Sequence, residues 1–126
     1  MGRERCVGAL LAGGLARRFG RRPKGLATIG GVRVAHLALG ALCAATSDQL
    51  VVVNDPDVAR QFSGWRTVPD VEPGLGPLAG LAAALEAADG MSIIAVAWDM
   101  PFVSAPIHAE LRALGERGAA AVVPVH

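Results

Sequence analysis

The sequence predicts a three-layer α/β sandwich on a mostly parallel, Rossmann-like sheet, and three observations support this fold class. Apolar runs of strand length alternate with helical patterns along the chain, and this repetition implies parallel strands with helices on both faces. The length of 126 residues suits one domain. Apolar residues make up 52% of the chain, which is enough to fill one core. We therefore expect residues 1–126 to form a single α/β domain of the doubly wound kind.

Local patterns predict the elements of the first half of the chain. Short apolar runs indicate buried strands, and longer runs with helical periodicity indicate helices. The expected elements are a strand at Cys6–Leu11, a helix at Val34–Ala45, a strand at Leu50–Val53 and a short helix at Asp57–Phe62. Gly30-Gly31, which lies between two short extended stretches, is typical of a small surface turn.

The second half continues the same alternation of strands and helices. The expected elements are a short strand at Arg66–Val68, an Ala-rich helix at Pro77–Ala88, a strand at Ser92–Ala97, a helix at Pro106–Leu114 and a closing strand at Ala121–Val125. Pro77 suits the first turn of its helix. Gly115 or Gly118 is expected to end the last helix.

The overall charge and the apolar runs exclude several classes of protein. Twelve Lys and Arg stand against eleven Asp and Glu, so there is no global field for nucleic acid or a membrane surface. No run approaches the roughly 18 apolar residues of a membrane span. The apolar run near the start is too short for a signal peptide, and Gly13 and Gly14 break it. We therefore expect a cytoplasmic protein that binds neither nucleic acid nor membrane.

The cysteines and two of the histidines give no sign of a metal centre. Cys6 and Cys43 lie inside apolar patterns and are expected to be buried free thiols. His36 and His108 fall inside helical patterns without the spacing of zinc ligands, so both are expected to be structural or exposed.

Positive charge is concentrated in one loop. Five of the twelve basic residues lie there, namely Arg17, Arg18, Arg21, Arg22 and Lys24. The loop follows Gly13-Gly14, where the backbone can approach a ligand closely and present N–H groups. A glycine turn followed by basic side chains is typical of a site that binds a phosphate group. One or two cations suffice for that purpose, so Arg17, Arg21 and Arg22 are expected to be solvated surface charges.

Polar residues follow the predicted strands where ligands bind in such sheets, beyond the carboxyl ends. They are Asn54-Asp55, Asp70 and Asp99. Asp70 and Asp99 can supply oxygen ligands to Mg²⁺, which binds through one or two carboxylates and the phosphates of a nucleotide. Asn54-Asp55-Pro56 is equally well read as a plain turn before a helix. Trp98 is expected to pack on the sheet face opposite to Asp99.

Two common nucleotide-binding patterns are absent from the glycine-rich stretch. A Walker loop needs GxxxxGK followed by Ser or Thr, and residues 20–24 do not have it. A dinucleotide oxidoreductase needs GxGxxG and an acidic residue about twenty positions later, but no acidic residue occurs between Glu4 and Asp48. Both classes are therefore disfavoured.

Three motifs resemble those of one family. The residues LAGGxxxRxGxxxKGL, Leu11 to Leu26, resemble the opening signature of the nucleotidyltransferase family that contains molybdenum cofactor guanylyltransferase. PDVEPGLGPLAGL, Pro69 to Leu81, resembles its Asp-plus-GPLAG segment, and WDMPFV, Trp98 to Val103, its metal segment. The resemblance runs from about residue 6 to the end. It implies a nucleotidyltransferase-type sheet and transfer of GMP from GTP to the terminal phosphate of molybdopterin, or molybdenum cofactor, with release of pyrophosphate.

The resemblance also implies roles for individual residues. It places Leu11, Ala12, Gly13 and Gly14 in the nucleotide loop. It places Lys24 and Arg18 at the phosphates, where they would act in catalysis. It places Asn54 and Asp70 at the nucleotide, and Asp99 at both the nucleotide and Mg²⁺, as a catalytic metal ligand.

The chain departs from the family pattern at two points. Pro23 precedes Lys24, where guanylyltransferases commonly carry Asp and cytidylyltransferase relatives carry Pro. Family members also generally continue beyond the last predicted strand, so the chain is expected to lack a C-terminal part. With an exposed sheet edge, it is expected either to form a homo-oligomer or to be marginally stable. The alternatives are cytidylyl or other nucleotidyl transfer to a related phosphorylated acceptor, or a non-catalytic nucleotide-binding accessory module.

Overall fold

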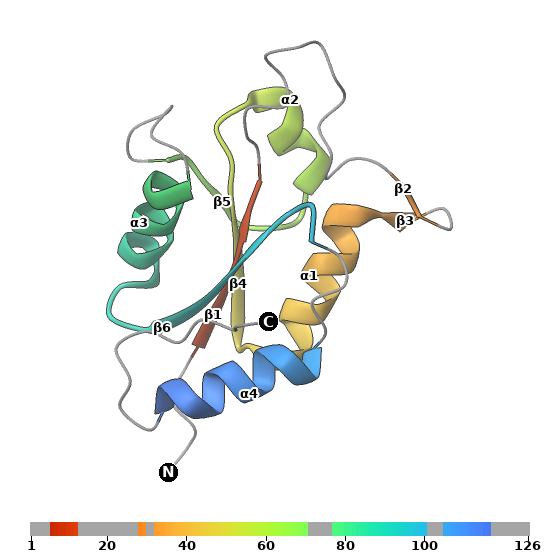
Figure 1. Cartoon of the computed structure of the whole chain (residues 1–126). Coiled ribbons are helices and arrows are strands. Elements are labelled where there is room, and N and C mark those ends of the chain that lie inside the picture. Colours follow the sequence, from red (N-terminus) through yellow and green to blue (C-terminus); the bar gives the residue numbers. More distant parts are fainter. Residues whose placement is uncertain (1–5, 13–27, 30–31, 71–76, 101–104, 117–126) are drawn as a thin grey trace.

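A computed structural model of the chain describes residues 6–12, 28–29, 32–70, 77–100 and 105–116. Its centre is a four-stranded sheet in the order β5-β4-β1-β6, in which all neighbours run parallel (Figure 1). The strands are β1 (Cys6–Leu11), β4 (Asp48–Val52), β5 (Thr67–Val68) and β6 (Ser92–Ala97). The predicted α/β class with a parallel sheet is therefore confirmed.

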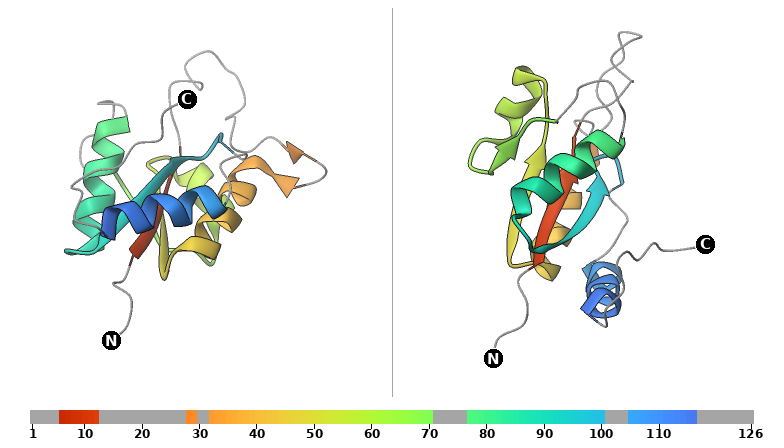
Figure 2. Two further views of the ribbon diagram at one scale, coloured as in Figure 1. Left: turned by 60° about the horizontal axis from the view of Figure 1, so that its bottom comes forward. Right: turned by 90° about the vertical axis from the view of Figure 1, so that its left-hand side faces the viewer.

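Helices cover both faces of this sheet (Figure 2). One face packs on α1 (Val34–Ala45), on α2 (Pro56–Ala59) and on the short 3-10 helix η3 (Arg60–Phe62). The other face packs on α3 (Pro77–Ala88). The fourth α-helix, α4 (Ala105–Glu116), packs on α1. This arrangement is a three-layer sandwich, as the alternation of strands and helices predicts.

The alternation of side chains along β1 divides the core between the two faces. Cys6 and Leu10 point to the cluster under α1, whereas Val7 and Ala9 point to the cluster under α3. All four side chains are buried, because β1 lies between β4 and β6 and is covered on both sides. Burial on both faces explains why β1 reads as a continuous apolar run instead of an alternating one.

A hairpin precedes α1. Thr28–Ile29 (β2) pairs antiparallel with Val32–Arg33 (β3), as the predicted turn at Gly30-Gly31 requires, although the turn itself lies outside the described residues. Arg33 Nη1 donates to Gln61 Oε1. This contact ties the hairpin to η3.

Several predicted boundaries and one predicted burial are corrected by the structure. β4 begins at Asp48 and ends at Val52 instead of spanning Leu50–Val53, and β5 begins at Thr67 instead of Arg66. The predicted helix at Asp57–Phe62 starts at Pro56 and changes to η3 after Ala59. Cys43 is exposed and not buried, whereas Cys6 is buried, and the two cysteines form no disulfide with each other. The predicted strand at Ala121–Val125 lies outside the described residues.

Among the described helices, none is both long and apolar enough to cross a membrane.

Helix α1 crosses β1 closely at Gly8. A Cβ atom added there would lie 2.9 Å from Thr46 Oγ1 and 3.1 Å from Leu42 Cβ. Thr46 Oγ1 is itself fixed, because it donates to Leu42 O and accepts from Gln49 Nε2. We expect Gly8→Ala to lower the free energy of unfolding by about 1–3 kcal/mol through overpacking, measured by urea denaturation. Gly40, where an added Cβ meets nothing within 4 Å, is the matched control. Equal effects at both positions would contradict the close crossing.

His108 is a buried polar residue on α4. Its side chain is 1% exposed, and neither ring nitrogen has a hydrogen-bond partner among the residues that the structure describes. Burial lowers the pKa of this imidazole below its usual value, because the charged form is poorly solvated there. Four residues further along α4, Arg112 Nη1 donates to Ala45 O at the end of α1. Residues four positions apart in a helix lie on the same side, so His108 and Arg112 share one face of α4.

This burial predicts a dependence of stability on pH. Because the folded-state pKa of His108 is lowered, the unfolded chain binds more protons just below its ordinary pKa of about 6.5. The stabilisation from burying the neutral His108 side chain is fully present above that pH. It is lost as the pH falls toward the folded-state pKa. We expect His108→Phe to reduce the loss of unfolding free energy between pH 7.5 and 5.5, measured by urea titration at both values. The same loss in the variant would contradict this assignment.

Candidate nucleotide site

The carboxyl end of β1 is held between its two neighbours. Ala12 N donates to Val52 O at 2.9 Å, and Trp98 N donates to Leu11 O at 3.0 Å. These bonds continue the parallel pattern one step beyond the strands, so Leu11 and Ala12 form a fixed ledge at the edge of the sheet. The next residues, Gly13 and Gly14, lie outside the described part of the chain, as do Arg18 and Lys24.

Asp70 lies beside this ledge, on the face of the sheet that α3 covers. Its backbone N–H donates to Asn54 Oδ1 at 2.8 Å. Its carboxylate reaches the first turn of α3, because a Cβ atom added at Gly80 would lie 3.4 Å from Asp70 Oδ1 and 3.5 Å from Leu11 Cδ2. A carboxylate near the start of a helix is stabilised by the helix dipole. The structure therefore brings Leu11 and Asp70 together, as the strand ends predict.

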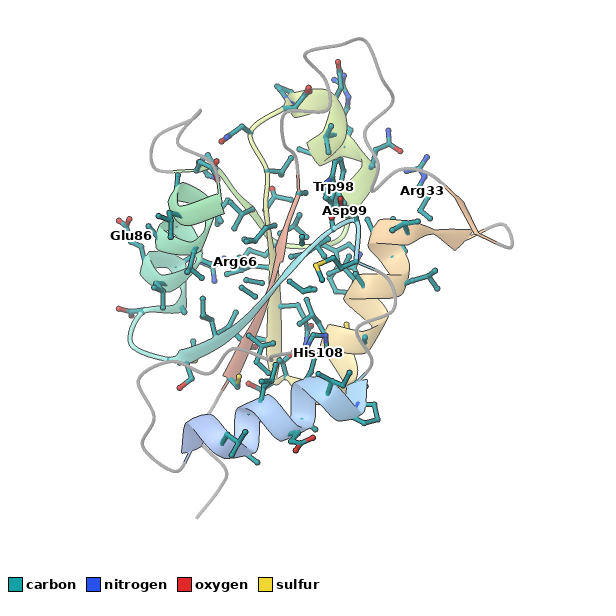
Figure 3. All side chains as sticks on the ribbon, viewed as in Figure 1. Arg33, Arg66, Glu86, Trp98, Asp99 and His108 are labelled. Atoms are coloured by element: carbon teal, nitrogen blue, oxygen red, sulfur yellow. The ribbon has the colours of Figure 1, made fainter. Side chains whose placement is uncertain are left out.

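Asp99 follows β6 at the same carboxyl edge (Figure 3). Met100 N donates to Ala97 O at 3.2 Å and closes the turn that contains Asp99. Trp98 anchors this turn, since its side chain is 5% exposed and packs in the cluster under α1. Asp99 itself is exposed. Trp98 therefore packs on the sheet face that α1 covers, whereas Asp99 lies at the surface.

The positions of the two carboxylates limit how they can bind a metal ion. Asp70 follows β5 and Asp99 follows β6, the two edge strands of the four-stranded sheet. With adjacent strands about 4.8 Å apart, the ends of β5 and β6 are separated by roughly 14 Å. The described residues contain no group of three His, Cys, Asp or Glu side chains able to hold a metal ion. Within the described part of the chain, this edge therefore presents two separate carboxylates and not one cluster of protein ligands.

A hard cation fits this edge when phosphates of a bound substrate supply part of its coordination. Mg²⁺ keeps several waters and commonly takes only one or two carboxylates together with substrate phosphates. Asp99, exposed on a closed turn at the sheet edge, can supply one such oxygen.

Asp55 has a structural role that the sequence left open. Asp57 N donates to Asp55 Oδ1 at 2.8 Å, so Asp55 caps the N-terminus of α2. The turn interpretation therefore holds for Asp55. The neighbouring Asn54 also has a contact within the protein, because its side-chain oxygen accepts a hydrogen bond from the backbone N–H of Asp70.

Sequence reasoning missed one residue of this edge. Gly80 is buried in the first turn of α3, where it leaves room for the Asp70 carboxylate. A glycine inside an otherwise Ala-rich helix can indicate such a close approach. The glycine at position 80 was therefore the signal in the sequence.

Comparisons with known proteins identify relatives of this chain. A probable molybdenum cofactor guanylyltransferase of Bacillus subtilis is 36% identical over 124 residues, which cover 94% of this chain and 60% of that protein. The chain thus spans about 60% of the length of this relative. Molybdopterin-guanine dinucleotide biosynthesis protein A from Archaeoglobus fulgidus superimposes with a TM-score of 0.74 at 27% identity, covering 95% of this chain and 61% of that one.

A further solved structure shares the fold alone. Rv0371c from Mycobacterium tuberculosis, in complex with manganese, matches with a TM-score of 0.67 at 18% identity, covering 91% of this chain and 61% of that one. The model of the MobA-like NTP transferase domain matches residues 8–126. Since this match covers nearly the whole chain, the chain belongs to the MobA-like NTP transferase family.

Proposed function

We propose that this chain binds GTP at the carboxyl edge of its sheet and transfers GMP to the terminal phosphate of molybdopterin, releasing pyrophosphate. The guanylyltransferase from Bacillus subtilis and the dinucleotide biosynthesis protein from Archaeoglobus fulgidus support this choice of substrates. We also propose that Mg²⁺ binds together with the nucleotide, because this cation commonly takes one or two carboxylates along with substrate phosphates.

One observation carries the proposal. The ledge of Leu11 and Ala12 lies between two carboxylates that follow opposite edge strands of the sheet. An extended ligand suits this layout better than a compact ion does, provided that its neutral end lies at one carboxylate and its anionic end meets the other through a bound cation. The nucleoside would lie against the ledge and Asp70, and the phosphates would extend toward Asp99.

The basic loop would complete the site on the phosphate side. Gly13 and Gly14 would present backbone N–H groups, and Lys24 and Arg18 would neutralise the triphosphate. The structure does not describe these four residues, and their roles rest on the motif in the sequence.

The reaction itself demands positioning more than acid–base chemistry. An oxygen of the acceptor phosphate forms a bond to the α-phosphorus of GTP, while the bond from that phosphorus to the bridging oxygen of pyrophosphate breaks. The acceptor is already an anion, so no base is needed to activate it. Mg²⁺, when bound at Asp99 with the phosphates, would offset negative charge. The protein groups orient the two substrates and stabilise the leaving group.

The decisive experiment is a transfer assay with labelled nucleotides. The chain is incubated with molybdopterin, Mg²⁺ and GTP, CTP or ATP labelled at the α-phosphate. We expect label in a pterin dinucleotide with GTP, together with one equivalent of pyrophosphate. A preference for CTP would instead indicate cytidylyl transfer. Tight GTP binding without product would indicate a non-catalytic nucleotide-binding module, and absence of binding to all three would contradict the proposal.

A further inference from the structure

The hydrogen-bond ladder between β4 and β5 ends at a side-chain acceptor instead of a backbone carbonyl. Val51 N donates to Arg66 O at 2.8 Å, and Val53 N donates to Val68 O at 2.9 Å. The evenly spaced bonds of a parallel pair would next bring the Asp70 N–H to the Val53 carbonyl. Instead this N–H donates to the side-chain oxygen of Asn54. The side chain of Asn54 therefore replaces the backbone as the acceptor for the next step of the ladder.

This replacement matters because it ties the Asp70 backbone to the end of β4. Pro69, which precedes it, has no N–H to donate. The Asp70 amide is thus the first donor beyond Val68 that can tie this segment to β4. Fixing this amide restrains the backbone from which the Asp70 carboxylate reaches Gly80.

The identity of the bonded atom indicates a role for Asn54. A backbone N–H can only donate, so the amide oxygen of Asn54 must face Asp70. That oxygen is engaged within the protein, and only the amide nitrogen of Asn54 could face a ligand. We propose that Asn54 is a positioning residue, which acts on the nucleotide by holding the Asp70 carboxylate in place. The inference rests on the proposed function in one respect, namely that Asp70 contacts the nucleotide.

Hydrogen exchange of the Asp70 amide in the ligand-free chain tests the bond itself. We expect Asn54→Ala to raise its exchange rate roughly twofold to tenfold, the range for loss of one ordinary hydrogen bond. Asn54→Asp keeps an acceptor oxygen at the same place and should preserve the protection. Gln49→Ala removes an amide that contacts Thr46 at the other end of β4 and should change nothing at Asp70. Unchanged exchange in Asn54→Ala, or equal loss in Asn54→Asp, would overturn the proposal.

A double-mutant cycle tests the route to the nucleotide. If Asn54 acts through Asp70, Asn54→Ala weakens GTP binding roughly twofold to tenfold in the wild-type background but has almost no effect in the Asp70→Ala background. Equal losses in both backgrounds would show a direct contact and overturn the proposal. A wild-type chain that binds no nucleotide would instead contradict the proposed function, and the exchange experiment would still decide whether Asn54 holds Asp70.

Discussion

Asp99→Asn is expected to lower Mg²⁺-dependent GTP binding and any transfer activity on the order of 10²-fold or more, while the fold survives. Removal of a charge that stabilises a developing charge commonly has effects of this size. The substitution keeps the size of the side chain but removes the charge that a hard cation requires. Asp99 is exposed on its turn, so the core beneath it should be unaffected.

The control for this variant is Glu86→Gln, an equivalent change on the outer side of α3 (Figure 3). Glu86 is exposed and lies away from the sheet edge that carries Asp99. Calorimetric titration with GTP, in Mg²⁺ and in EDTA, separates the metal-dependent part of binding. We expect Asp99→Asn to reduce the affinity measured in Mg²⁺ to about the level that the wild-type chain shows in EDTA. A variant that keeps the full effect of Mg²⁺ would show that Asp99 is not the metal ligand.

Lys24→Ala is expected to weaken GTP binding roughly 10- to 100-fold, the range for loss of a hydrogen bond to a charged group, and to weaken GMP binding much less. The physical reason is that a compact cation placed at the β- and γ-phosphates interacts with charges that GMP lacks. Calorimetric titration with both nucleotides provides the comparison.

The matched control for Lys24 is Arg21→Ala, which removes a cation from the same basic stretch of sequence. Because we expect Arg21 to be a solvated charge, its removal should have little effect on either nucleotide. Equal losses of GTP and GMP affinity in the Lys24 variant would place the lysine away from the outer phosphates. A large effect at Arg21 would show that the phosphate contacts are distributed along the loop.

The regular elements could be predicted from the sequence because their patterns are long or strongly apolar. The observed bounds of β1, α1, α3 and β6 agree with the prediction. The prediction was less accurate at α2, where a single turn of α-helix passes into a 3-10 turn. Over so few residues, a turn of α-helix and a 3-10 turn have the same hydrophobic pattern. Periodicity therefore could not distinguish them. Cys43 was misplaced because α1 combines an apolar sequence with an exposed side.

The candidate site was predictable only in part. The rule that ligands bind beyond the carboxyl ends of parallel strands placed Leu11, Asp70 and Asp99 at one edge. It could not show that Asp70 and Asp99 follow opposite edge strands, because strand order depends on contacts between distant segments. It also could not distinguish Asp55, which caps α2, from Asn54, which bonds to a residue 16 positions away. Such assignments require the folded arrangement.

Paramagnetic broadening of the two tryptophan indole signals tests most directly whether a metal–nucleotide complex binds beside Asp99. The chain has two tryptophans: Trp98 precedes Asp99 at the carboxyl edge, whereas Trp65 lies before the start of β5. Mn²⁺ is substituted for Mg²⁺, and the spectrum of ¹⁵N-labelled protein is recorded with and without GTP. We predict that Mn²⁺ with GTP broadens the Trp98 indole signal much more strongly than that of Trp65, and that Asp99→Asn abolishes the difference. Equal broadening of both signals, or stronger broadening of Trp65, would contradict a nucleotide site at this edge.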